Sequence, residues 1–190
     1  MNQNDKRNIR GAVMGGLFLL AAGLGGGALA AEASKTPTLN LGLPVTCVGQ
    51  STETYAPPVT SAAQSILVTD TVNAAQCLGG FIGRAQIQGA SVSPDLSCYS
   101  LLNASDEVLN VTWNDGRTST LSLTYASIGA QGSATVVVYE GTVTAGAFAG
   151  YNVKRTTVYA SPDVTGRCLV TNGGVTDISG ATTLVLSPVL

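Results

Sequence analysis

The sequence predicts an all-β protein, specifically an antiparallel β-sandwich of about eight to ten strands. Runs rich in Val, Thr, Ile and Tyr recur along the chain, and turn residues separate them. Beyond residue 31, no segment keeps a convincing helical period over about ten residues. The strongest hairpin signal is Asn114-Asp115-Gly116, which stands between two alternating runs.

The expected strands follow one another from residue 45 onward. They are 45–55, 65–72, 84–88, 108–113, 118–125, 134–144, 151–159, 168–171 and 182–187. Pro57 and Pro58 are expected to end the first strand, 61–64 to form at most one helical turn, and 91–95 to form a turn. The residues expected in the core are Trp113, Leu121, Leu123, Tyr125, Val136, Val138 and Val158.

The first thirty residues have the three parts of an export signal. Lys6, Arg7 and Arg10 precede an uncharged apolar run at 11–30, which ends in the small-x-small pattern Ala28-Leu29-Ala30. A transmembrane anchor is the alternative, because twenty apolar residues can span a bilayer. The glycines of the run and the cleavage pattern favour a signal peptide over residues 1–30. We therefore expect a secreted, extracellular protein that is free of the membrane after cleavage.

An extended N-terminal arm, 31–44, is expected to precede a β domain at 45–190. Leucine alternates with small or polar residues between Pro37 and Pro44, which places the leucines on one face of an extended segment. Such a segment is either an edge strand or disordered leader of the domain, or an arm that pairs with another protein. The residues named as partner-binding are Thr38, Leu39, Leu41 and Leu43.

The cysteines are expected to form two disulfides. They are Cys47, Cys77, Cys98 and Cys168. An even number, no CxxC pair, no histidine and an exported chain favour disulfides over zinc. Of the three possible connectivities, Cys47–Cys77 is preferred because 45–55 and 65–72 would fold back as a hairpin about residue 62. Cys98–Cys168 then follows by elimination.

Composition removes most classes of enzyme. The absence of histidine excludes a Ser-His-Asp triad, a Cys-His pair, an HExxH zinc site and a histidine pH switch. Without the signal, six basic and ten acidic residues remain, and the scattered cations offer no footprint for nucleic acid. Most acids stand beside Gly, Ser, Pro or Asn, as surface turn residues do, and Asp106-Glu107 is the one adjacent pair. We expect no catalytic residues, no cofactor and no metal.

Trp113 allows a second interpretation. An exposed indole is a platform on which sugars stack, so a carbohydrate-binding protein is an alternative. The position of Trp113 in an alternating run just before a turn favours core packing.

Several segments together resemble a family of small secreted actinobacterial proteins. They are Val45-Thr46-Cys47, Leu96-Ser97-Cys98, 112–120 (TWNDGRTST), 141–150 (GTVTAGAFAG), Cys168 and 173–176 (GGVT), and the terminal Thr-Leu-Val-Leu strand. The resemblance covers roughly residues 45–187. Its segments are turn and strand residues rather than a catalytic signature.

Some proteins of this kind are similar to the small adaptor subunits of umbrella toxin particles, which are secreted antibacterial assemblies. There the adaptor joins a lectin-bearing subunit to the helical-repeat spokes of a large polymorphic toxin. The resemblance implies a non-catalytic protein-binding module with those two kinds of partner. A secreted carbohydrate-binding protein or hydrolase acting on cell-wall sugars, and an inhibitor of extracellular proteases, are the alternatives.

Overall fold

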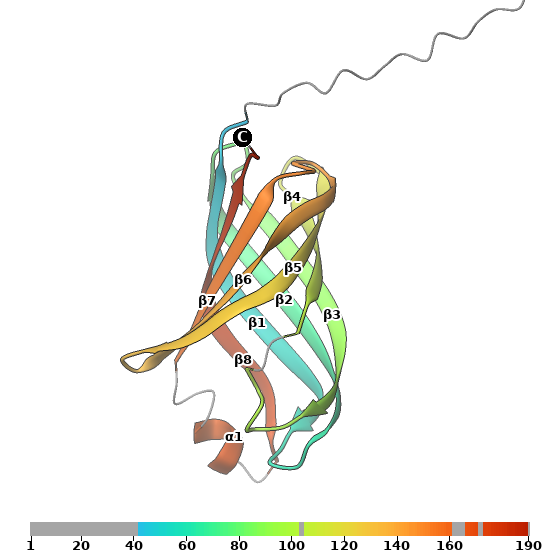
Figure 1. Ribbon diagram of the computed structural model, residues 1–190, viewed down its shortest axis with the longest axis vertical. Coiled ribbons are helices and arrows are strands. Elements are labelled where there is room, and N and C mark those ends of the chain that lie inside the picture. The colour runs from blue at the N-terminus through green and yellow to red at the C-terminus, as the bar shows by residue number, and fades with distance from the viewer. Residues whose placement is uncertain (1–41, 103–104, 161–165, 171–172, 190) are drawn as a thin grey trace, which may run out of the picture. The chain divides into compact units, whose positions relative to one another are not determined.

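Eight strands form one antiparallel sheet that closes on itself as a barrel (Figure 1). The computed structural model describes residues 42–102, 105–160, 166–170 and 173–189, so the predicted signal peptide and most of the arm lie outside the described residues. The elements are β1 (Val45–Val59), β2 (Gln64–Leu78), β3 (Ala85–Leu96), β4 (Glu107–Trp113), β5 (Thr118–Gln131), β6 (Ala134–Gly146), β7 (Asn152–Ala160), α1 (Arg167–Val170) and β8 (Val175–Ser187).

The strands follow chain order around the barrel, and β8 returns to pair with β1 from Val45↔Leu186 to Thr54↔Asp177. The all-β class is therefore confirmed, whereas the two-layered sandwich is replaced by a closed wall. A period-two pattern specifies which face of a strand is buried, but it is the same in both architectures. Closure pairs β1 with β8 and so removes the free edges that a sandwich keeps.

Four local predictions are wrong. β1 continues past Pro57 and Pro58 to Val59, because its register with β8 jumps from Thr54 to Val59 and the prolines need no ladder partner there. The predicted turn at 91–95 is part of β3, where pairing with β2 continues to Ser93↔Ile66. Residues 168–170 of the predicted strand at 168–171 belong to the short helix α1. The predicted helical turn at 61–64 is a bend that leads into β2.

The turn around Gly116 and the aromatic residue before it are as predicted. Trp113 is almost completely buried, and its indole N–H donates a 2.8 Å hydrogen bond to Ser119 Oγ. The ring of Phe148 meets the indole edge to face, with centroids 5.3 Å apart. Trp113 therefore belongs to the core and offers no exposed ring on which a sugar would stack.

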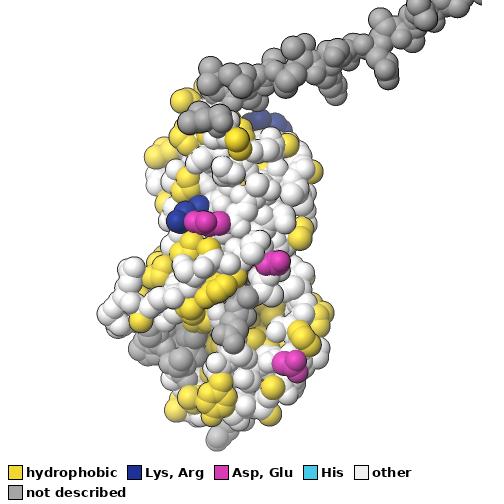
Figure 2. All heavy atoms as spheres, viewed as in Figure 1, with side chains coloured by type: hydrophobic (Ala, Val, Ile, Leu, Met, Phe, Trp, Pro, Cys, Tyr) yellow, Lys and Arg dark blue, Asp and Glu magenta, His cyan; other side chains and the backbone are white. Residues whose placement is uncertain are grey.

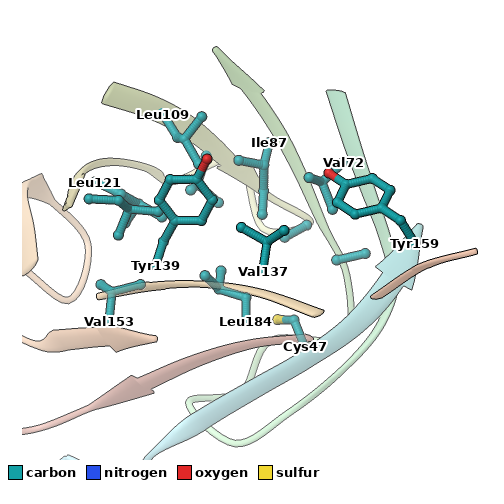
Figure 3. Packing of buried hydrophobic residues seen from close by; sticks show 14 of the residues in the cluster. Cys47, Val72, Ile87, Leu109, Leu121, Val137, Tyr139, Val153, Tyr159 and Leu184 are labelled. Carbon is teal, nitrogen blue, oxygen red and sulfur yellow. The ribbon is translucent and has the colours of Figure 1, made fainter. Parts of the chain in front are cut away.

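The core prediction is right for β5 and out of phase in β6 and β7. Leu121 and Leu123 are buried as expected, and Tyr125 is half-buried. In β6, Val137 and Tyr139 point inward in place of Val136 and Val138; in β7, Tyr159 is buried and Val158 is 38% exposed. Three consecutive valines carry no alternation, so the sequence alone does not fix which of them faces the core. Figure 3 shows the rings of Tyr139 and Tyr159 in the barrel interior on either side of Val137.

Both predicted disulfides are present. Cys47 and Cys77 stand directly opposite each other in the β1–β2 ladder, which confirms the predicted hairpin. Cys98, just after β3, is bonded to Cys168 of α1 and also donates its backbone N–H to Thr60 O at 2.9 Å. The second disulfide therefore fixes the connection between β3 and β4 to the end of the barrel that carries α1.

The two ends of the barrel are different. We call the end with α1 and the β1–β2 turn the lower end, and the end where β1 starts and β8 finishes the upper end (Figure 1). The β5–β6 hairpin projects from the lower part of the wall, with residues 127–133 exposed. Figure 2 shows that charged side chains on the visible face are few, and that one basic and one acidic side chain there lie in contact. No helix in the described segments has the length and apolar character needed to cross a membrane.

Replacing both members of the lower disulfide tests its contribution. We expect Cys98→Ser/Cys168→Ser to lower the free energy of unfolding by roughly 2–4 kcal/mol, because the unfolded chain loses a 70-residue cross-link. Urea denaturation followed by tryptophan fluorescence measures the change. Non-reducing peptide mapping is the control, and a Cys47–Cys168 peptide would contradict the pairing.

Candidate functional site

The candidate site lies where the short strand β4 leaves part of the barrel wall without a ladder. β3 pairs with β4 over only four residues, from Ala85↔Trp113 to Gln88↔Asn110. At Gly89 the side chain of Leu109 of β4 packs against the backbone of β3, so a Cβ there would collide with it. Beyond Gly89, Leu101 and Leu102 of the β3–β4 connection, which Cys98 anchors, line the cavity together with Ser91 and Ser93 of β3.

A cavity of about 70 Å³ lies beneath this part of the wall. Ser91 and Ser93 of β3, Leu101 and Leu102 of the connection and exposed Val108 of β4 line its outer part. Its inner part is polar, with three carboxyl groups and three tyrosines: Glu53, Tyr55, Asp70, Glu107, Tyr139 and Tyr159. The volume is enough for several water molecules or one small chemical group.

One buried guanidinium connects the carboxylates. Arg155 of β7 is only 2% exposed, and its Nη1 lies 2.5 Å from Asp70 Oδ2 and 2.9 Å from Glu107 Oε2. Its Nη2 donates to Ser51 Oγ at 2.9 Å, and that hydroxyl donates to Asp70 Oδ1 at 2.8 Å. The guanidinium also lies 5.9 Å from the ring centre of Tyr139. Arg155 therefore links β7 to β1, β2 and β4 through the barrel interior.

Glu53 is held differently. Its two carboxyl oxygens accept hydrogen bonds from Tyr159 at 2.5 Å and from Tyr55 at 2.9 Å. Arg155 forms its ion pairs with Asp70 and Glu107, not with Glu53. Glu53 is thus the one carboxyl group lining the cavity that is held by neutral hydroxyl groups alone.

Burial shifts the titration of these groups. Burial raises the pKa of Glu53, against the opposing effect of the hydrogen bond from Tyr159. Burial likewise raises the pKa of Glu107 to about 7, although the charge of Arg155 opposes it. Burial also raises the pKa of Tyr55 and Tyr159 above the ordinary tyrosine value, so both hydroxyl groups keep their protons and stay donors.

Two buried polar atoms of the cluster have no hydrogen-bond partner within the described part of the chain. They are Asp70 Oδ2 and Arg155 Nε. Asp70 Oδ2 is close to Arg155 Nη1 as an ion pair, but the contact lacks hydrogen-bond geometry. The charge of Arg155 thus compensates Asp70 Oδ2, and Arg155 Nε is the one of these two atoms that has neither a hydrogen bond nor an ion pair within the described residues.

Sequence reasoning did not identify this cluster. It assigned most acids to surface turns and gave no role to Asp70, which lies in the expected strand 65–72, or to Arg155, whereas both are buried inside the barrel. A signal was present, because Asp70 keeps the inward phase of Ile66 and Val72, and Arg155 keeps that of Val153. A charged residue in the apolar phase of a strand predicts a buried partner, but it does not say which residue that partner is.

The residues named from sequence fall into two groups. The four cysteines form the predicted disulfides. Thr38, Leu39 and Leu41 lie outside the described residues, and Leu43 is described and 69% exposed. In the described ranges, no three His, Cys, Asp or Glu side chains are grouped so as to hold a metal ion.

No protein-family model, curated protein or solved structure matches this chain. The cavity and the surface of the barrel are therefore the features from which a function can be inferred.

Glu107 gives the cluster a pH dependence. Its raised pKa means that the folded state binds the proton more tightly than the unfolded state, so stability is greatest below pH about 4.5 and falls as the pH rises through about 7. In the wild type, the free energy of unfolding should fall between pH 4.5 and 8. We expect this fall to be smaller by up to about 3 kcal/mol in Glu107→Gln, because the amide keeps the size of the side chain and never ionises. Urea denaturation at pH 4.5, 6 and 8 measures the difference.

The matched control is Glu140→Gln, which removes a carboxylate from an exposed ion pair with Lys154 and should leave the pH dependence unchanged. Parallel stability curves for the wild type and Glu107→Gln between pH 4.5 and 8 would contradict the assignment.

Proposed function

We propose that this protein is a non-catalytic binding protein and that the polar cavity of its barrel is the binding site. The observation that carries the proposal is a cavity of about 70 Å³ with three carboxyl groups and three tyrosines in its wall. An eight-stranded barrel has an interior of the size that holds one small ligand. Its hydrogen-bonded wall fixes the polar groups before the ligand arrives, which lowers the entropic cost of binding.

The arrangement of the carboxyl groups favours binding over catalysis. Glycosidases need two carboxyl groups facing each other across a sugar ring. Here Asp70 and Glu107 contact the same nitrogen of Arg155, which draws them together instead of leaving space for a substrate between them. The cavity is also far smaller than the roughly 300–1,000 Å³ of ordinary small-molecule sites. Its occupant is therefore a very small molecule or the end of a larger one.

A fragment titration tests the cavity as a binding site. Small cationic, neutral and anionic compounds are added one at a time. We expect at least one of them to shift the amide NMR signals of residues lining the cavity. Ser93→Leu should abolish those shifts because its side chain fills the mouth, whereas Ser127→Leu on the exposed hairpin should not. Absence of cavity shifts with every compound, or equal binding to Ser93→Leu, would contradict the proposal.

The upper end supports a second candidate, a protein-binding function. Phe81 is fully exposed and has a backbone φ of 59°, a conformation that costs free energy in a residue with a side chain. Leu78 and Leu43 are also strongly exposed, and Gly79 touches Pro44, so the exposed apolar residues flank two segments in contact. Exposed apolar groups of this kind are typical of surfaces that bind other proteins.

On this second proposal the protein is a secreted adaptor. The disulfides are compatible with an oxidising exterior. The lectin-bearing subunit and the helical-repeat subunit of an umbrella toxin particle are the partners that the sequence resemblance implies. The arm at 31–44 would join the same interface, because Leu43 lies at its end.

Truncation of the arm tests the adaptor proposal. We expect deletion of residues 31–43, or Phe81→Ser, to reduce recovery of the lectin-bearing and helical-repeat subunits with the tagged protein from culture supernatant at least fivefold. The melting temperature should hardly change, because Leu43 and Phe81 are exposed. Val92→Ser, which removes an exposed apolar group from β3, is the control. Undiminished recovery, or a large fall in melting temperature on deletion, would contradict this role.

A further inference from the structure

We infer that the cavity takes a primary ammonium group, carried either by a small free amine or by a lysine side chain, with Glu53 as its counter-ion. The inference rests on the proposed binding function and assigns the chemistry of the ligand.

The balance of charge in the cavity favours a cation. Three carboxyl groups line the cavity, and Arg155 forms ion pairs with two of them, Asp70 and Glu107. Glu53 has only the hydroxyl groups of Tyr55 and Tyr159 on its oxygens. An anion entering this space would face the carboxyl groups at short range, whereas a cation would pair with Glu53.

The hydrogen-bonding groups select an ammonium among cations. An ammonium has three N–H donors and no acceptor, so it needs a wall of acceptors. The carboxyl oxygens of Glu53 and the hydroxyl oxygens of Tyr55 and Tyr159 are such acceptors, and all three residues line the cavity. The small volume suits an ammonium better than a planar guanidinium, and no metal-holding group exists among the described residues.

Pairing with a cation would also change the protonation of the site. Burial raises the pKa of Glu53, whereas a paired ammonium favours the ionised carboxylate, so binding of the ammonium is coupled to release of a proton from Glu53. Affinity should therefore increase with pH. The ionisable groups around Glu53 are Tyr55 of β1, Asp70 of β2, Glu107 of β4, Tyr139 of β6, and Arg155 and Tyr159 of β7. Glu107, whose pKa burial raises to about 7, also gains negative charge over this pH range and so acts in the same direction.

The test is an NMR titration of the full-length secreted protein with n-butylammonium chloride at constant ionic strength. Butan-1-ol and sodium butyrate are the neutral and anionic probes of similar shape. We expect butylammonium to shift the cavity amide signals with a dissociation constant at least tenfold lower than either, and to bind more tightly at pH 8 than at pH 5. Glu53→Gln should weaken this binding at least tenfold, while Glu140→Gln on the exposed outer surface should not change it.

A second variant guards against misfolding. If Glu53→Gln alters the amide spectrum as a whole, Tyr159→Phe removes one hydroxyl group from Glu53 and keeps the ring, and it should weaken binding about three- to tenfold. Equal binding of butanol or butyrate, or unchanged butylammonium binding by a folded Glu53→Gln, would overturn the inference.

The probes also distinguish a free amine from a lysine side chain as the source of the ammonium. They separate failure of the ammonium inference from failure of the proposed binding function. Nα-acetyl-lysine amide binding as tightly as butylammonium supports a lysine side chain as the ligand, whereas butylammonium binding alone supports a free amine. If butanol or butyrate occupies the cavity and butylammonium does not, the ammonium inference fails but the proposed binding function stands. If no probe reaches the cavity, both fail.

Discussion

The interior of the barrel is organised around one buried charge. A guanidinium that is 2% exposed is tolerated only where carboxylates and hydroxyl groups satisfy it, and the partners of Arg155 come from β1, β2 and β4. Loss of one partner from such a buried pair costs roughly 3–5 kcal/mol, so the network penalises every other register of β7. A slip of one residue would turn Arg155 outward and leave Asp70 unpaired inside. The charge thus specifies the barrel as much as it stabilises it.

The same network explains why the cavity exists. Apolar side chains fill the upper half of the barrel around Trp113, whereas the lower half contains charged and hydroxyl groups. β4 starts late, so the wall beside β3 is completed by a connection that the Cys98–Cys168 bridge holds in position. A covalent bond can fix such a connection where a hydrogen-bonded ladder is missing. The bridge therefore anchors the connection at Cys98, beside a cavity that a longer β4 would have closed.

The sequence predicted two hairpins of this fold correctly. Cys47 faces Cys77 because a hairpin between neighbouring strands is decided by residues close in sequence, and the turn at Gly116 follows the same logic. Closure of the sheet was not predicted, since pairing of the first strand with the last leaves no trace in local periodicity. The polar cluster was missed for a related reason. Asp70 and Arg155 are 85 positions apart, and no pattern in a single sequence links them.

Closure by β1 and β8 has a consequence for how the chain folds. Seven of the eight strand pairings join neighbours in sequence, but the eighth joins residues such as Val45 and Leu186 from opposite ends of the domain. Closing such a long loop reduces the conformational entropy of the chain. This loss comes before the hydrogen bonds of the β1–β8 ladder can offset it. Until β8 has been synthesised, β1 remains an open edge. A circular permutant that connects the two strands directly and opens the wall at the exposed Gly132 turn would make this contact local without changing any side chain in the interior.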